Sequence, residues 1–297
     1  MSTLLTITEL TKKDIENILD LSKRMHTIPC DILKHKNILF AFEKPSLRTK
    51  VGTEAAINHL GGNVIHIEPS NFFNRESLKD TVQNVAQWCD AIFARVFSHQ
   101  TLCDMSTFSP IPIVNALCDK HHPMQALADL LTIQEKFGTT KISAAFVGDA
   151  NNVAFSFLEI LLKFGYDVRF AGPEAYFFSS ESQSYFKKLA EESGDSILFT
   201  TDPLKAVSNA HVIYTDTFIS MGEEKIYEEK MRHFEGYQIN KTLFSHAHPD
   251  AVFMHCLPAH RGVEVTDEIM DSTNSLIYEQ AKNRMIVSKG VFVKLLT

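Results

Sequence analysis

Residues 142–170 read ISAAFVGDANNVAFSFLEILLKFGYDVRF, and this stretch decides the predicted fold. A β-rich apolar run at 142–147 is followed by a polar turn at 148–152 and then by apolar residues at helical spacing as far as Phe164. Gly165 stands where a helix would end, and a second β-rich run begins at Val168. A strand, a helix and a second strand in this order predict a βαβ unit with parallel strands.

The same alternation extends over almost the whole chain. The other β-rich runs are Asn37–Phe42, Val64–Ile67, Ala91–Phe97, Ile111–Asn115, Val212–Tyr214 and Val252–Cys256. The other helical patterns are Thr11–Met25, Arg48–Leu60, Ser77–Trp88, Pro123–Phe137, Ser182–Glu191 and Asn274–Leu296. We therefore predict an α/β protein with two doubly wound domains, each with a central parallel sheet flanked by helices.

The length of 297 residues also favours two domains rather than one. A helix is expected to stop at Gly138, where a new βα series begins. This places one domain at residues 1–138 and a second at residues 139–277, with a C-terminal helix at 278–297 that packs back on the first domain.

Composition excludes several classes of protein. The net charge is 29 − 36 = −7 with scattered Lys and Arg, so we expect no nucleic-acid surface. No apolar run approaches the roughly 20 residues that span a membrane, and the first ten residues show no secretion signal, so we expect a cytoplasmic protein. Five cysteines without CxxC spacing indicate reduced thiols rather than disulfides or a zinc ribbon, and we predict no metal and no cofactor.

The first segment that could carry chemistry is EKPSLRTK at 43–50, between a predicted strand and a predicted helix. Backbone N–H groups at a helix N-terminus, two hydroxyls and the Arg48 guanidinium together suit a phosphate. In the alternative interpretation Ser46 only caps the helix, while Arg48 and Lys50 are solvated.

Two further groups follow in the first half. Arg95 ends an apolar strand, where a guanidinium is costly unless it is paired, and it could polarise a ligand carbonyl. His122 and Gln125 open a long helix, which places imidazole and carboxamide groups near the positive end of the helix dipole. A lone histidine at this position is more often an ordinary helix cap, which is the alternative interpretation of His122.

The second half offers polar groups after three predicted strands. GDANN at 148–152 suits a small polar ligand, although ordinary turn chemistry explains it as well. Asp216 follows one strand, and HCLP at 255–258 follows another. Cys256 at a strand end could be a functional thiol or an inert buried one.

In chain order, SLRT at 46–49, Arg95, HPMQ at 122–125, DTFISMG at 216–222 and HCLP at 255–258 resemble the aspartate/ornithine transcarbamoylase family. The match runs over nearly the entire chain, and its last two segments resemble the ornithine-specific members. The resemblance implies transfer of the carbamoyl group of carbamoyl phosphate to the δ-amine of L-ornithine. It also implies a homotrimer.

The resemblance assigns residues to each substrate. The carbamoyl-phosphate site would comprise Ser46, Leu47, Arg48, Thr49, Asn71, Arg95, His122, Gln125, Cys256, Leu257 and Arg284. The ornithine site would comprise Asn152, Asp216, Ser220 and Met221. The expected catalytic residues are Arg48, Arg95, His122, Asp216 and Cys256.

Four positions depart from the family pattern. Leu47 replaces a common threonine, Lys50 a frequent arginine, Asn71 a usual glutamine and Phe218 a frequent tryptophan. Two other functions stay open. One is a sister transcarbamoylase that acts on putrescine or an N-acylated ornithine, and the other is a noncatalytic ligand-binding subunit with the same fold.

Overall fold

A computed structural model describes residues 3–26, 30–138, 140–219 and 227–297. Its strands are β1 (Asn37–Phe42), β2 (Asn63–His66), β3 (Ala91–Arg95), β4 (Ile113–Leu117), β5 (Ser143–Val147), β6 (Asp167–Ala171), β7 (Ile197–Thr200), β8 (Val212–Tyr214) and β9 (Val252–Met254). Its longer helices are α1 (Lys12–Arg24), α2 (Arg48–His59), α4 (Leu78–Val85), α5 (His99–Phe108), α6 (Pro123–Phe137), α7 (Asn152–Lys163), α8 (Ser180–Ser193) and α13 (Ile277–Leu296). The shorter ones are α3 (Pro69–Phe73), η1 (Glu174–Tyr176), α9 (Pro203–Val207), α10 (Tyr227–His233), α11 (Lys241–Phe244) and α12 (Asp267–Met270).

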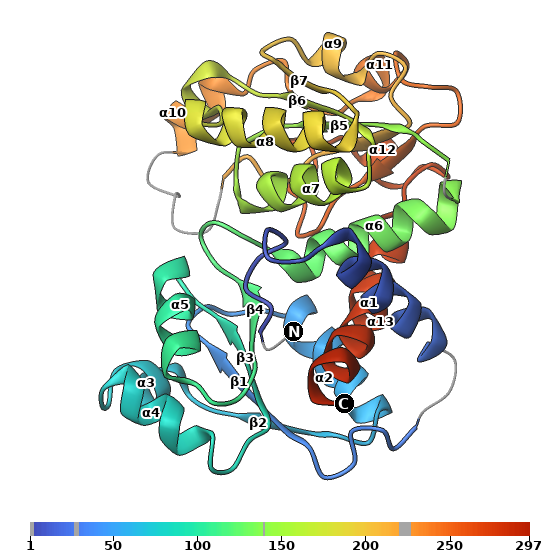
Figure 1. The fold of residues 1–297 in the computed structure, drawn as a ribbon. Helices are drawn as coiled ribbons and strands as arrows, with labels where there is room; N and C mark the ends of the chain where they lie inside the picture. The colour runs from blue at the N-terminus through green and yellow to red at the C-terminus, as the bar shows by residue number, and fades with distance from the viewer. Residues whose placement is uncertain (1–2, 27–29, 139, 220–226) are drawn as a thin grey trace. The chain divides into compact units, whose positions relative to one another are not determined.

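These strands form two parallel sheets, with the orders β2-β1-β3-β4 and β7-β6-β5-β8-β9 (Figure 1). In the first sheet α1, α2 and α13 cover one face and α3, α4 and α5 cover the other. In the second, α7 and α8 lie on one face, while α9 packs on the opposite face. The prediction of doubly wound α/β architecture is confirmed, because each sheet grows outward in both directions from its first strands.

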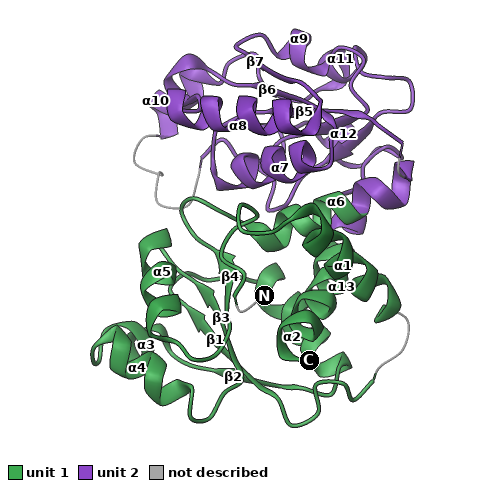
Figure 2. Cartoon of the chain, in the orientation of Figure 1, with its two compact units in different colours: residues 1–131, 281–297 green, residues 132–280 purple. Residues whose placement is uncertain are grey.

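The chain divides into two compact units (Figure 2). Unit 1 comprises residues 1–131 and 281–297, and unit 2 comprises residues 132–280. Both divisions fall inside helices, α6 and α13, whereas the sequence placed the first boundary at the end of α6. Most of α13 belongs to unit 1, where Phe292 meets Phe93 of β3 with ring centroids 5.9 Å apart.

Strand register brings the polar strand ends of each sheet together. In unit 1, Phe42 of β1 pairs with Arg95 of β3, and the next residue, Glu43, donates its N–H to the Arg95 carbonyl at 2.8 Å. In unit 2, Tyr214 of β8 lies between Phe146 of β5 and Met254 of β9. The direction in which strands are added to the sheet changes beside β1 in the first sheet and beside β5 in the second. Open α/β sheets bind ligands at such switch points.

Some elements differ from the sequence-based prediction. Strand β7 was not predicted. It is an edge strand in which Leu198 is 41% exposed, so its sequence lacks the continuous apolar run of a buried strand. The short helices α3, α10, α11 and α12 were also not predicted, nor was α5. Within the described ranges, no helix is long and apolar enough to cross a membrane.

Candidate active site

The segment after β1 leads directly into α2. Leu47 is the N-cap of this helix, its side chain is 72% exposed, and it makes no side-chain capping bond. The alternative in which Ser46 caps the helix is therefore wrong. The first turn of α2 contains no acidic residue, and Arg48 is its first residue. The helix thus begins with N–H groups that the N-cap side chain leaves uncapped and with a guanidinium, which together favour an anion.

Four residues of unit 1 form what we call the guanidinium cluster: Thr49, Arg95, His122 and Arg284. Arg284 of α13 is buried and donates from Nη2 to the Thr49 hydroxyl of α2. Burial, with the positive charge of Arg284 as the second cause, lowers the pKa of Arg95 to about 10. Among the described residues, Arg95 Nε has no hydrogen-bond partner. A partly buried cation influenced by another cation favours an anionic or strongly polar ligand.

His122 is 3% exposed and immediately precedes α6. Burial, followed by the positive charges of Arg284 and Arg95, holds the pKa of His122 well below its usual value. The imidazole is therefore neutral near pH 7, and a neutral ring can donate one N–H to a carbonyl oxygen. Its backbone carbonyl accepts from the N–H of Gln125 and Ala126, so His122 also occupies a helix-capping position. The helix-capping interpretation is thus supported, and a functional role for the His122 imidazole stays a prediction.

A second group of contacts, which we call the carboxylate–thiol cluster, lies at the strand ends of unit 2. Asn151 accepts from the N–H of Val153 and Ala154 at 3.0 and 2.9 Å, and so caps α7. Its Nδ2 donates to Asp216 Oδ2 at 2.8 Å. Cys256 Sγ donates to the other oxygen, Oδ1, at 3.0 Å. Asp216 is 7% exposed, so both oxygens of a nearly buried carboxylate are held by donors.

His255, beside this cluster, has a fixed orientation. Its Nδ1 accepts from the Leu257 N–H at 2.9 Å, and the backbone N–H of His255 donates to Gln280 Oε1 at 2.8 Å. Nε2 lies 3.4 Å from Oε1 of the buried Glu264. Leu257 has a φ of +59° and is followed by a cis bond to Pro258. A leucine at positive φ carries about 1–3 kcal/mol of backbone strain, and such strain concentrates at functional sites.

Asp216, His255 and Cys256 could also hold a metal ion, because one ligand atom of each lies within 4.8 Å of the others. An ion there would compete with two existing hydrogen bonds. Cys256 donates to Asp216, which keeps a proton on the sulfur, and His255 Nδ1 is engaged by a backbone N–H. The arrangement as it stands suits a polar organic ligand at Asp216.

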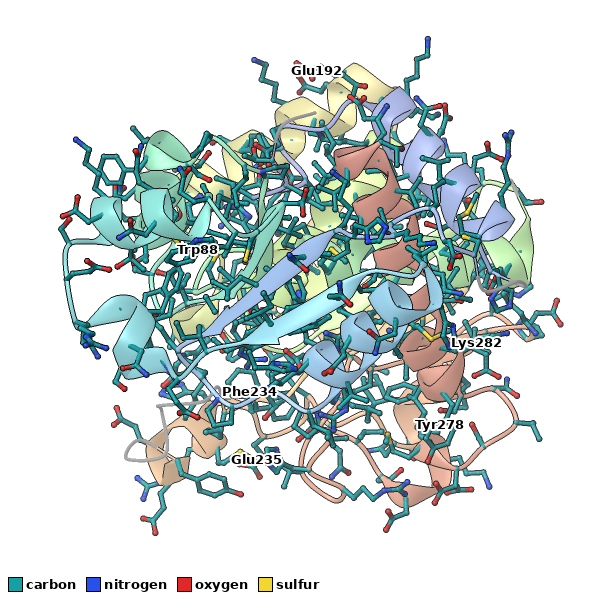
Figure 3. The ribbon with its side chains drawn as sticks, turned by 90° about the horizontal axis from the view of Figure 1, so that it is seen from below. Trp88, Glu192, Phe234, Glu235, Tyr278 and Lys282 are labelled. Atoms are coloured by element: carbon teal, nitrogen blue, oxygen red, sulfur yellow. The ribbon has the colours of Figure 1, made fainter. Side chains whose placement is uncertain are left out.

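The packing around the second cluster explains how its backbone is held. A Cβ at Gly172 would lie 2.5 Å from the Gly148 carbonyl, so glycine permits the close approach of β6 to the turn after β5. Phe218, one of the departures from the family pattern, is 1% exposed. It stacks on Phe234, which is labelled in Figure 3, with ring centroids 4.4 Å apart. Phenylalanine at 218 is thus a core residue of unit 2.

The structure places the remaining predicted residues as follows. Ser46 is half-buried, and Asn71 lies on α3 with an exposed side chain. Asn152 is the first residue of α7, but the bond to Asp216 comes from its neighbour Asn151. Ser220 and Met221 lie outside the described residues.

Three residues that contact predicted segments of the site were not identified from the sequence. Asn151 lies in the GDANN turn at 148–152, and an asparagine directly before an apolar helix is a capping signal that could have identified it. Asp129, one turn beyond Gln125, accepts from Gln125 Nε2 at 2.7 Å. Lys230 of α10 is fully buried and pairs with Asp149 at 2.7 Å. Nothing in the local sequence distinguishes Lys230 from a solvated lysine.

Two parallel α/β units, one with a partly buried guanidinium group at a strand end and the other with a buried carboxylate just after a strand, are typical of an enzyme that acts on small charged molecules. Comparison with known proteins specifies the family. Residues 2–135 match the description "Aspartate/ornithine carbamoyltransferase, carbamoyl-P binding domain", and residues 140–295 match "Aspartate/ornithine carbamoyltransferase, Asp/Orn binding domain".

Individual relatives agree with these matches. The chain is 42% identical to the ornithine carbamoyltransferase of Pyrococcus abyssi over 301 residues, which cover 99% of this chain and 95% of the relative. It is 40% identical to that of Bacillus subtilis over 297 residues, covering 99% and 93% of the two chains. The solved ornithine carbamoyltransferase of Pyrococcus furiosus superposes with a TM-score of 0.95 at 40% identity, covering 99% and 96%. The chain belongs to the aspartate/ornithine carbamoyltransferase family.

Proposed function

We propose that this carbamoyltransferase transfers the carbamoyl group of carbamoyl phosphate to the δ-amine of L-ornithine, giving L-citrulline and phosphate. Similarity to ornithine carbamoyltransferases over essentially the whole chain carries the proposal. In this proposal residues 1–138, with the helix at 278–297, bind carbamoyl phosphate, and residues 139–277 bind ornithine. The guanidinium and carboxylate–thiol clusters have the charges that these two substrates require.

The phosphate group is assigned to the start of α2. Arg48 and the uncapped N–H groups neutralise its charge, with Ser46, Leu47 and Thr49 in the same turn. Arg95, His122 and Thr49 face the carbamoyl oxygen and stabilise the negative charge that develops there in the tetrahedral intermediate. The full proposed set for this substrate also includes Asn71, Gln125, Cys256, Leu257 and Arg284.

The amino acid is assigned to unit 2. Asn152, Asp216, Ser220 and Met221 form the proposed ornithine site, and Cys256 lies beside the reacting amine. Asp216 supports this assignment, because its buried carboxylate is oriented by Asn151 and Cys256 and matches an ammonium or amine donor. The thiol donates to the carboxylate in the structure, so an arriving amine can replace that donor without leaving Asp216 unsatisfied.

The reaction needs little covalent assistance. The neutral δ-amine attacks the carbamoyl carbon, the new C–N bond forms, and the C–O bond to phosphate breaks. The departing phosphate can accept the proton that the amine loses, so a dedicated protein base is unnecessary. Positioning and charge stabilisation supply most of the acceleration, and loss of one such donor typically lowers turnover by about 10² to 10³.

The test is detection of the ureido product with carbamoyl phosphate and a panel of amines that comprises L-ornithine, putrescine and an N-acylated ornithine. We expect citrulline from L-ornithine, competitive inhibition by norvaline, and little product from the other amines. A preference for putrescine or the N-acylated amine would replace the proposal with a sister transcarbamoylase. Absence of phosphate release with every amine would leave only a noncatalytic ligand-binding subunit.

Arg48→Ala provides a second test of the assignment, because it should weaken carbamoyl-phosphate binding more than it affects ornithine. Unchanged carbamoyl-phosphate affinity would contradict the role of Arg48. A homotrimer and a cytoplasmic location complete the proposal. Sedimentation of the purified chain and fractionation of the source cells would test these two points.

A further inference from the structure

One face of α6 carries three buried polar residues in succession. His122 precedes the helix, Gln125 follows three positions later, and Asp129 lies four positions beyond Gln125. Residues at these spacings share a helix face. Their exposures are 3%, 1% and 0%, so each needs defined polar partners. Only the first two were assigned to the carbamoyl-phosphate site.

The contact between Gln125 and Asp129 determines which end of the amide faces the substrate. Gln125 Nε2 donates to Asp129 Oδ1 at 2.7 Å. A carboxylate accepts hydrogen bonds and has none to give, so only the amide nitrogen can face Asp129. The amide oxygen must then point the other way. Within the described residues, Gln125 Oε1 is buried and accepts no hydrogen bond.

We propose that Asp129 is a positioning residue that makes Gln125 present a hydrogen-bond acceptor, and that this acceptor selects the –NH2 group of the carbamoyl substrate. The inference rests on the proposed function. An acyl phosphate such as acetyl phosphate has a methyl group in place of –NH2, so it would leave the buried Oε1 without a donor. Sites built around a substrate N–H discriminate strongly against analogues that lack it.

The experiment compares the dissociation constants of carbamoyl phosphate and acetyl phosphate, measured by titration of the full-length chain without ornithine. The wild type should bind carbamoyl phosphate much more tightly. Asp129→Asn allows the Gln125 amide to face either way, so the ratio of the two constants should fall about tenfold or more. Asp90→Asn is the matched control. Asp90 bonds Lys36 and the Asn37 N–H at the opposite strand ends of the same unit, and its replacement should leave the ratio unchanged.

A double variant separates orientation from simple structural support. In Asp129→Asn with Gln125→Glu, the new amide donates to the new carboxylate, whose second oxygen again faces the substrate as an acceptor. The ratio should then recover toward the wild-type value. A purely structural role for the Asp129 carboxylate predicts no such recovery.

Three outcomes would overturn the inference. They are an unchanged ratio in folded Asp129→Asn, no recovery in the folded double variant, and full discrimination by Gln125→Met, which removes the acceptor without altering Asp129. The last variant keeps the inference testable if Asp129→Asn does not fold. Failure of the proposed function is distinguishable, because the wild type itself would then bind no carbamoyl phosphate and form no citrulline.

Discussion

Replacing Asn151 by serine separates the two contacts that this side chain makes. Serine caps helices about as well as asparagine, so α7 should keep its N-cap. The shorter serine hydroxyl does not replace the 2.8 Å bond from Nδ2 to Asp216. A hydrogen bond to a charged group contributes about 1.5–3 kcal/mol, and 1.4 kcal/mol corresponds to a factor of ten in a binding constant. If Asp216 binds ornithine, Asn151→Ser should therefore raise the ornithine KM by about 10-fold to 100-fold.

The assay is steady-state citrulline formation with each substrate varied in turn, together with thermal unfolding. Carbamoyl-phosphate affinity should stay within about twofold, because neither Asn151 nor Asp216 is assigned to that substrate. Asn240→Ser is the matched control: Asn240 caps α11 through the Leu243 N–H at 3.0 Å and has no described contact with Asp216. If Asn151→Ser and Asn240→Ser have the same ornithine KM, orientation of Asp216 by Asn151 is refuted.

Three further predictions address other parts of the chain. Cys256→Ala should raise the ornithine KM more than the carbamoyl-phosphate Kd, and equal ornithine use in variant and wild type would exclude a role for the thiol. Lys230→Met removes the ion-pair partner of the largely buried Asp149 and should lower the free energy of unfolding by about 3–5 kcal/mol in denaturant titrations. Lys241→Met is the control, because the Lys241–Glu268 pair is exposed and its loss should change the free energy of unfolding little. Burial lowers the pKa of His121 to about 4, so below about pH 6.5 the unfolded chain binds a proton that the folded chain does not, and stability should fall from there toward pH 4. His121→Gln should flatten this dependence of stability on pH, and an unchanged dependence would show that His121 is not its cause.

Much of the fold was predictable because parallel strands have a clear signature. β1, β3 and β5 are buried on both faces, and each reads as a short continuous apolar run. Their polar residues follow the strand ends, where the sheet order places ligand sites, so Arg95 and Asp216 could be selected from position alone. Edge strand β7 and the four-residue helices lack such a signal, since tertiary packing rather than local pattern stabilises them.

The supporting residues were harder to predict, for a different physical reason. Arg284 lies 235 positions after Thr49, and no local pattern reports a hydrogen bond across that separation. Lys230 pairs with Asp149 across 81 positions. The resemblance to a known family identified Arg284. A resemblance based on substrate contacts does not identify residues that contact only the substrate-binding residues. Asp129 and Asn151 both fall in this group.

The electrostatic difference between the two clusters follows from the groups that each sheet places at its strand ends. In unit 1, the charge that acts on Arg95 is the like charge of Arg284, so binding an anion relieves repulsion as well as forming hydrogen bonds. In unit 2, Asp216 is held by a thiol and an amide, which are neutral donors, so its negative charge is left to attract a cationic or amine group. Each cluster is therefore completed by a substrate of opposite charge, and a substitution that neutralises one cluster should weaken its own substrate much more than the other.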